Sequence, residues 1–347
     1  MPIVQIQPRN ARNLFRNTEE NVNAQDERGF TCLHWLVMTG NDRRDVGTLR
    51  RLLERGANPM VRDTKSLTAL DRACTLGRLN MMETLVEYSG GEALHAPTAI
   101  AGRTPLHFAN ESLQYQAAVP LLLKLGADIN VRSKHRGRTI LHETVLRHDG
   151  TPKTAAHVEW LVTHCGANVQ AVDHHGWTAL HYAAFMGHVD LVASLLRLGA
   201  SPRTRDKLGR TPLHVTGRKV PLPPWDEDIT LVLVEPRKKC QPDDENMNDK
   251  RKQFLELQQQ HRPPIHPANA NTYIQHTHST NQPMHSSSAA CASQIVQLLL
   301  QHGAEAWSVD RQGNLAFFWA AQANDLTVIL DFVQAAALEG MFGKMPN

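Results

Sequence analysis

The sequence predicts an all-α solenoid built from about seven helix-turn-helix units. The main observation is a phrase of the form GxTxLH, which recurs with variations along the chain in steps of 33 to 39 residues. Its threonines are Thr31, Thr68, Thr104, Thr139, Thr178 and Thr211. A second phrase, LLxxGA, ends at Ala57, Ala127, Ala200 and Ala304. Self-similarity with this period indicates small stacked modules that share one continuous core.

The helices are clearest in the unit at residues 173–200. Apolar residues at spacings of three and four predict a short first helix that ends at Gly187. A second amphipathic helix follows and ends at Gly199. The preceding phrase, residues 173–176, has the composition of a tight turn. One pair of such short helices buries too little apolar surface to fold alone, so neighbouring units must stack on it.

These phrases resemble the ankyrin repeat, and its TPLH phrase stands unchanged at Thr104–His107 and Thr211–His214. The resemblance covers roughly residues 23–216 and 291–335. It implies that the histidine of each phrase hydrogen-bonds the turn backbone and orders the hairpin. These histidines are His34, His107, His142, His181 and His214.

Several units depart from the ankyrin pattern. In the second unit, Ser66 stands in place of the turn glycine and Asp71 in place of the histidine. In the third and fourth units, Ala99 and Lys134 are expected to replace the turn aspartate. The last unit, from Asp310 on, reads LAFF where TPLH belongs, and we expect it to be a terminal cap.

A long segment inside the sixth unit differs in composition from the repeats. It is rich in proline, histidine, glutamine and serine and poor in aromatic residues, so it buries too little apolar surface to offset the entropy of ordering. We expect it to be mostly disordered. The predicted parts are a flanking segment at 1–22, repeats one to five with half of the sixth at 23–216, the insert at 217–290, the rest of the sixth repeat with the capping repeat at 291–340, and a tail at 341–347.

The insert contains two basic clusters that resemble a bipartite nuclear localisation signal. Two clusters on an extended chain can fill two acidic grooves at once, but a solvated charged stretch is an equally good interpretation because an acidic spacer lies between them. The cluster residues are Arg237, Lys238, Lys239, Lys250, Arg251 and Lys252. A short proline-rich stretch at 221–225 is more readily a stiff spacer than a ligand for a groove-binding domain.

Composition narrows the function classes. A net charge of +3 and a sequence pI near 8.6 are too mild to argue for nucleic acid as a partner. The five cysteines are odd in number and unevenly spaced, which argues against a disulfide framework and for a reducing compartment. No apolar run approaches the roughly 18 residues that span a bilayer, and no secretory segment opens the chain. We expect a protein of the cytoplasm, the nucleus or both, without membrane contact.

Three motifs resemble catalytic or metal sites but lack a required residue or spacing. His142 and Glu143 begin like HExxH, but the next histidine is His148, which lies on another helix face. The DHHG phrase at 173–176 lacks the cysteine of the DHHC acyltransferases. His276 and His278 are poor evidence for a metal site, since such sites need tighter ligand pairing. We therefore expect no enzyme activity, cofactor, metal or small-molecule substrate.

The ankyrin resemblance implies a protein partner that contacts the hairpin tips and the exposed ends of the first helices, on the concave side. Arg, Trp, Met and Phe at exposed positions are what interface cores favour, and the tips are basic, so we expect a partner with an acidic face. For Trp177 and Phe185, packing against neighbouring repeats is the alternative. The candidate partner-binding residues are Arg28, Phe30, Arg103, His135, Arg136, Arg138, His174, His175, Trp177, Phe185, Met186, Lys207 and Arg210.

The sequence therefore predicts a non-enzymatic ankyrin scaffold or adaptor for protein–protein interaction. The alternative is a nuclear regulator whose repeats bind a transcription factor and whose insert directs import. Resemblance to a family gives function only as a class, because this fold hosts many partners.

Overall fold

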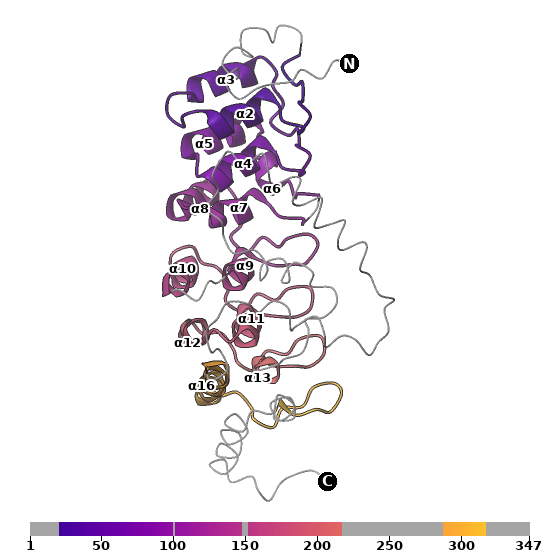
Figure 1. Cartoon of the computed structure of the whole chain (residues 1–347), viewed down its shortest axis with the longest axis vertical. Coiled ribbons are helices and arrows are strands. Elements are labelled where there is room, and N and C mark those ends of the chain that lie inside the picture. Colours follow the sequence, from indigo (N-terminus) through magenta and orange to yellow (C-terminus); the bar gives the residue numbers. More distant parts are fainter. Residues whose placement is uncertain (1–20, 100, 148–151, 217–286, 317–347) are drawn as a thin grey trace, which may run out of the picture. The chain divides into compact units, whose positions relative to one another are not determined.

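A computed structural model describes residues 21–99, 101–147, 152–216 and 287–316 of the chain (Figure 1). Its helices form two rows. The first helices of the units are α2 (Cys32–Thr39), α4 (Ala69–Leu76), α7 (Pro105–Glu111), α9 (Ile140–Leu146), α11 (Ala179–Met186) and α13 (Pro212–Val215). The second helices are α3 (Val46–Glu54), α5 (Leu79–Tyr88), α8 (Tyr115–Lys124), α10 (Pro152–Thr163), α12 (Val189–Arg197) and α16 (Ser287–Gln301), and a short extra helix, α6 (Glu92–His95), follows α5.

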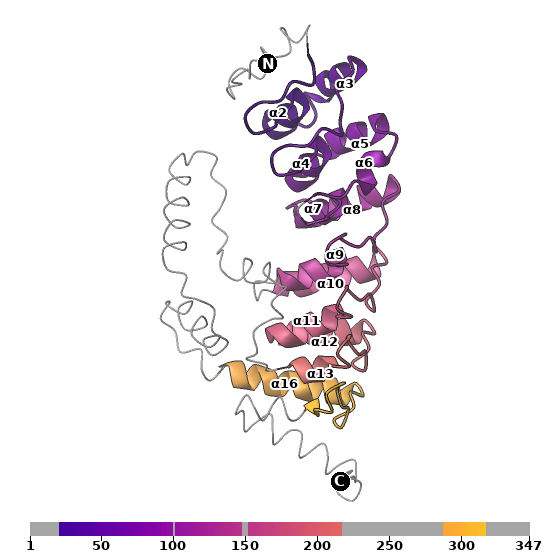
Figure 2. The ribbon, with the colours of Figure 1, turned by 90° about the vertical axis from the view of Figure 1, so that its right-hand side faces the viewer.

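Each first helix packs against the first helix of the next unit, so the units follow one another in chain order (Figure 2). Figure 1 shows the second helices at the left, the first helices in the middle and the hairpin loops at the right. Within the described ranges, the only strand-like pairing is an isolated bridge between Val309 and Leu315. The predicted all-α solenoid of helix-turn-helix units is confirmed.

The shared core comes from the leucine of each TxLH phrase and from small residues behind it. Leu33, Leu70, Leu106, Leu141, Leu180 and Leu213 are all buried. Ala73, Ala109 and Ala183 are also buried, each five residues after its capping threonine. Small side chains at these positions let adjacent helices approach closely, and each unit thereby covers the apolar face of its neighbour.

The histidines of the repeat phrase join one unit to the next. In α11, the His181 Nδ1 accepts the N–H of Thr178 at 3.1 Å, which leaves the ring proton on Nε2. That Nε2–H donates to the carbonyl of Arg210 in the following hairpin at 3.2 Å. The same bridge runs from His34 to Leu67, from His107 to Arg138 and from His142 to Trp177. The structural role that the ankyrin resemblance implies is thus observed for His34, His107, His142 and His181, whereas the Nε2 of His214 has no hydrogen-bond partner among the described residues.

The second unit breaks this series. The Asp71 Oδ2 accepts the Thr68 N–H and O–H, as the histidine nitrogen does elsewhere. Its Oδ1 is buried and has no hydrogen-bond partner. Burial raises the pKa of Asp71 to about 6, because the charged form loses its hydration there. A carboxylate also cannot donate to the next hairpin, so the bridge made by the histidines is missing at this boundary.

The turns of the hairpins differ from the sequence prediction at two units. In the fifth unit, the Asp173 Oδ1 accepts the N–H groups of His175 and Trp177. In the third and fourth units, hydroxyl groups take this place: Thr98 Oγ1 accepts the Arg103 N–H, and Ser133 Oγ accepts the Arg138 N–H. The prediction that Ala99 and Lys134 replace the turn aspartate is therefore wrong. These two hairpins are one residue longer than the others, which shifts the equivalent position.

The second unit carries a backbone feature at the residue predicted to replace the turn glycine. Ser66 has a φ of 60°, in the left-handed region that glycine adopts without strain.

In the sixth unit, α16 begins at Ser287, inside the range assigned to the insert. The remainder of the predicted insert, its basic clusters and the apolar part of the predicted cap lie outside the described residues.

Candidate functional site

The tips of the hairpins form a row along one edge of the repeats, at the right of Figure 1. Backbone hydrogen bonds link the first tip to the second and, from the third tip on, each tip to the next one. The Lys134 N–H donates to Gly102 at 2.8 Å, and the His174 N–H donates to Arg136 at 2.9 Å. The Lys207 N–H donates to His175 at 2.9 Å. Similar bonds join Thr64 to Arg28 and Arg311 to Leu208. This row, which we call the hairpin edge, is held in place before any partner arrives.

Four of the residues predicted to contact a partner are buried inside the repeats. The exposed fractions of Phe30, Arg138, Trp177 and Arg210 are 6%, 5%, 4% and 7%. The expectation that they are exposed tip residues is therefore corrected. Each lies just before a capping threonine, and at that position the chain turns inward from the tip towards the first helix.

Arg210 and Trp177 belong to one buried polar cluster between the fifth and sixth units. The guanidinium of Arg210 forms a two-nitrogen ion pair with Asp206 Oδ2, at 2.8 Å from Nε and 2.7 Å from Nη2. The Trp177 Nε1–H donates to the same carboxyl oxygen at 3.0 Å. The planar guanidinium matches a carboxylate and also lies over the indole ring, 5.7 Å from its centroid. These side chains stabilise the hairpins and are not available to a partner.

Arg138 has a comparable role one unit earlier. Its Nε and Nη2 donate to the Tyr182 hydroxyl oxygen at 3.2 and 3.0 Å. The Tyr182 O–H in turn donates to Asp173 Oδ2 at 2.6 Å. The chain of contacts therefore connects the fourth hairpin to the fifth.

Arg103 lies in a network of charges at the ends of α7 and α9. Its guanidinium pairs with Glu143 at 2.6 Å and with Glu111, and Arg147 pairs with Glu111 at 2.6 Å. Burial opposes ionisation of Glu143, but the nearby cations, Arg103 first among them, outweigh it and hold the pKa of Glu143 below its usual range. Arg103 is therefore half-buried and already paired, and its charge is largely neutralised.

The remaining basic tip residues are accessible. Arg28, His135, His174 and Lys207 are exposed, and Arg136 and His175 are half-buried. Two imidazoles are held in position: the His135 Nε2–H donates to Ala99 at 3.1 Å, and the His174 Nδ1–H donates to His135 at 3.2 Å.

Two exposed lysines of the same edge were missed by the sequence analysis. They are Lys65 in the second hairpin and Lys134 in the fourth. Lys134 directly follows Ser133, as Lys207 follows Asp206. Aligning the turn on any short hydroxyl or carboxyl side chain, and not on aspartate alone, would have placed Lys134 at the tip.

Apolar groups lie beside the edge at the ends of the first helices. Phe185 and Met186, at the end of α11, are half-exposed, and Leu76, at the end of α4, is 44% exposed. The Phe185 ring packs against Trp177 with ring centroids 5.6 Å apart. One side of Phe185 is therefore packed inside the repeats, as the alternative interpretation of this residue predicted. Its other side remains accessible. The hairpin edge thus combines cations with an adjoining apolar patch.

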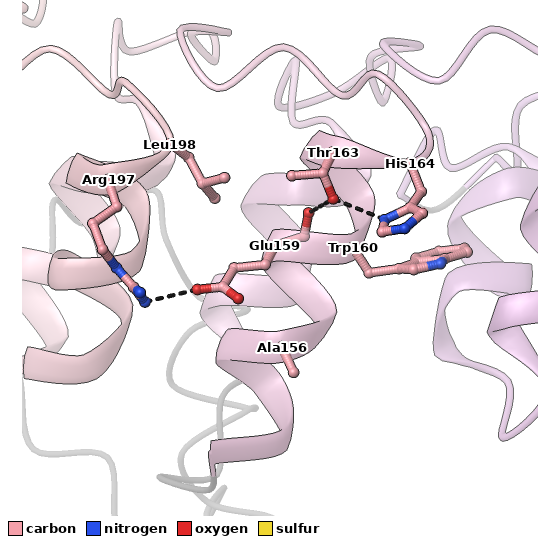
Figure 3. Close-up of a pocket in the computed structure, with 7 residues that line it drawn as sticks. All are labelled: Ala156, Glu159, Trp160, Thr163, His164, Arg197 and Leu198. Atoms are coloured by element: carbon pink, nitrogen blue, oxygen red, sulfur yellow. Dashed lines mark hydrogen bonds and ion pairs between the residues drawn. The ribbon is translucent and has the colours of Figure 1, made fainter.

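The second-helix side carries a pocket of about 360 Å³ between α10 and α12 (Figure 3). Glu159 of α10 pairs with Arg197 of α12 at 2.7 Å, and Thr163 bonds His164 at 2.8 Å. Trp160 supplies the aromatic surface. No catalytic constellation is evident in this arrangement, whose polar groups are paired with one another.

The described residues contain no group of three or more His, Cys, Asp or Glu side chains that could hold a metal ion. None of the helices described is both long and apolar enough to cross a bilayer. Cys32, Cys74, Cys165 and Cys291 carry free thiols. The histidines of the insert lie outside these ranges.

Comparison with known proteins agrees with this architecture. A family model described as three copies of the ankyrin repeat matches residues 7–96, 45–133 and 153–219. The B-cell lymphoma 3 protein homolog of Mus musculus is 32% identical over 204 residues, 58% of this chain and 43% of that protein. The palmitoyltransferase AKR1 of Lachancea kluyveri is 31% identical over 179 residues, 49% of this chain and 23% of that protein.

Among solved structures, the ankyrin repeat domain of Bcl-3, described as a member of the IkappaB protein family, is 31% identical. The match covers 60% of this chain and 87% of that one, with a TM-score of 0.49. The chain spans less than half of the length of the two curated relatives above. Because the family model covers more than half of the residues, the chain belongs to the ankyrin repeat family.

Proposed function

We propose that this chain is a non-enzymatic scaffold that binds a protein partner with an acidic face through the hairpin edge and the adjoining first-helix ends. The observation that supports the proposal is the row of exposed cations on tips already fixed by backbone bonds. Lys134 and Lys207 are exposed, and no ion pair to either is found among the described residues. Ankyrin repeats in general act as interaction modules, since their stacked units present extended surfaces.

Electrostatic reasoning favours an acidic partner over a neutral one. Positive tips attract an acidic surface over about a Debye length, roughly 8 Å at physiological salt, and so speed encounter. An exposed acidic residue, Glu27, lies on the tip of the first hairpin, and Lys134 and Lys207 lie on the fourth and sixth hairpins. A partner with an acidic face would therefore be repelled by the first tip and attracted by the later ones. The proposed contact therefore centres on units four to seven.

Affinity capture with mass spectrometry tests this function. The intact protein is compared with a variant in which Lys134, Lys207 and Arg311 are each changed to Glu. All three side chains are exposed, so the variant should keep its fold. A matched control places the same three charge reversals on the second-helix side, at exposed Arg51, Arg55 and Lys124.

We expect partners that the wild type and the control retain and the edge variant loses. Partners that bind the edge variant as well as the wild type would contradict the proposal. The earlier candidates Arg138 and Arg210 are unsuitable for such a test, because reversing a buried charge would disrupt the hairpins themselves.

A second candidate function is nuclear regulation through a bound transcription factor, with import directed by the insert. It is supported by the spacing of the basic clusters at 237–239 and 250–252, which lie outside the described residues. Changing Lys250 and Arg251 to Ala in a fluorescent fusion tests it. Nuclear signal that falls on this change supports import by these clusters, and a fusion that stays cytosolic in both forms would rule it out.

A further inference from the structure

We infer that the hairpin edge of units four to seven recognises an extended acidic segment of the partner, with acidic residues about three positions apart and an apolar residue among them. This inference rests on the proposed function and specifies the class of partner. It follows from the regular spacing of the tips and from the apolar patch beside them.

The spacing argument starts from the backbone. Lys134, His174, Lys207 and Arg311 occupy equivalent positions, each directly after the turn serine or aspartate, and each donates its N–H to the preceding tip at 2.8 to 2.9 Å. Stacked helices lie roughly 8–10 Å apart, so equivalent positions recur at about that distance. An extended chain advances about 3.3 Å per residue. Acidic residues at i, i+3 and i+6 would therefore meet successive tips.

The position of the cations suits carboxylates. Lys134, Lys207 and Arg311 are exposed, and among the described side chains no acid pairs with any of them. His135 and His174 donate one ring nitrogen each to neighbouring carbonyls, which fixes the orientation of the rings along the row. The edge therefore presents cations on the tips of units four, six and seven, with the His174 imidazole on the tip between the first two, and none of the three cations has a counter-ion among the described side chains.

The apolar element of the segment has a place beside the same tips. Phe185 is held against Trp177 on one side and is accessible on the other, with Met186 next to it. Leu208, in the sixth tip, is 48% exposed. Because a buried apolar side chain contributes more to affinity than exposed charge pairs do, this patch would anchor the segment while the tips set its register.

Nucleic acid is the rival polyanion. Single-stranded nucleic acid binds through a series of aromatic platforms that stack on successive bases, whereas the apolar patch here offers a single ring, Phe185, beside the aliphatic side chains of Met186 and Leu208. Trp177 is buried and donates to Asp206, so it is not available for stacking. The observations therefore favour a peptide.

Selection from a random dodecapeptide display library against the full chain tests the inference. The expected result is enrichment of peptides with Asp or Glu at intervals of three and at least one Leu, Ile, Phe or Met. Their affinity should fall about tenfold or more for the variant with Lys134, Lys207 and Arg311 changed to Glu, and for Met186→Ala with Phe185→Ala. It should be unchanged for the control with Arg51, Arg55 and Lys124 changed to Glu.

Three outcomes would overturn the inference: no enriched peptides, enriched peptides without acidic spacing, or tighter binding of a labelled single-stranded oligonucleotide than of any selected peptide. The proposed function can fail or survive separately. If affinity capture still yields proteins lost from the edge variant while display yields no acidic peptide, the edge binds a folded surface and only the extended-segment inference is wrong.

Discussion

The buried carboxyl of Asp71 makes a sharp prediction about stability. It replaces a histidine that elsewhere bridges two units, and its Oδ1 has no partner. The pKa of Asp71 is raised from 3.8 to about 6 in the folded protein, mainly by burial. Each pH unit between the two values is worth about 1.4 kcal/mol, so ionising this group costs the folded state about 3 kcal/mol at pH 7.5.

The sign follows from proton binding. Between pH 3.8 and 6, the folded protein holds the Asp71 proton more tightly than the unfolded chain does, so stability falls as the pH rises through this range. Above pH 6 the full penalty persists. Asp71→Asn removes the ionisation, while its amide oxygen can still accept from Thr68. We expect the variant to be more stable by up to about 3 kcal/mol at pH 7.5 and by about half of that at pH 5.

Urea denaturation followed by circular dichroism at both pH values measures the difference between variant and wild type. Taking the difference removes the pH dependence of stability that the histidines contribute, because this contribution is the same in both proteins. Asp128→Asn is a matched control, because Asp128 is exposed and an Asn there keeps the acceptor for the Asn130 N–H. An Asp71→Asn variant that is no more stable than wild type at pH 7.5, or a gain that does not shrink at pH 5, would refute the reasoning.

Three further predictions concern the repeats. Arg210→Ala leaves the Asp206 carboxylate buried without its cation and should cost about 3–5 kcal/mol in thermal or urea unfolding, whereas Lys207→Ala, at an exposed site, should change stability little. Leu195→Ala removes a fully buried side chain from α12 and should cost about 2–5 kcal/mol; a smaller loss would mean a loosely packed second-helix row. Burial lowers the pKa of His181 to about 4, below its ordinary 6.5, so the folded state loses stability as the pH falls between these values. In the Asp71→Asn variant, which lacks the opposing titration of Asp71, a free energy of unfolding in urea that is no lower at pH 5 than at pH 7 would contradict this.

The sequence was sufficient to predict the fold because each unit repeats the same local rules. The threonine caps, the helix-ending glycines and the apolar spacing are all short-range signals, and six copies in near register reinforce one another. The turn at Ser133 was misread because a hydroxyl performs the task of aspartate in a hairpin that is one residue longer. Alignment on a single residue type cannot detect such a replacement.

The candidate site was predicted less well, and the reason is geometric. Arg138 and Arg210 share the repeat phrase with exposed tip residues, yet their side chains turn inward to Tyr182 and Asp206. Arg138 finds its acceptor, Tyr182, in the neighbouring unit, and a pattern within one unit does not contain that information. Arg210 pairs with Asp206, four residues earlier in its own hairpin, because the fold of the turn brings the two side chains together. Lys207, three residues before Arg210, points outward for lack of such an acceptor among the described residues.

Site-specific photo-crosslinking tests the central claim most directly. A photoreactive phenylalanine analogue is placed at Lys134 or Lys207 on the hairpin edge, or at Arg51 or Lys124 on the second helices, and the captured partner is added to each protein. The account predicts a crosslinked complex from the two edge positions and none from the other two. Crosslinks that arise only from Arg51 or Lys124 would contradict it.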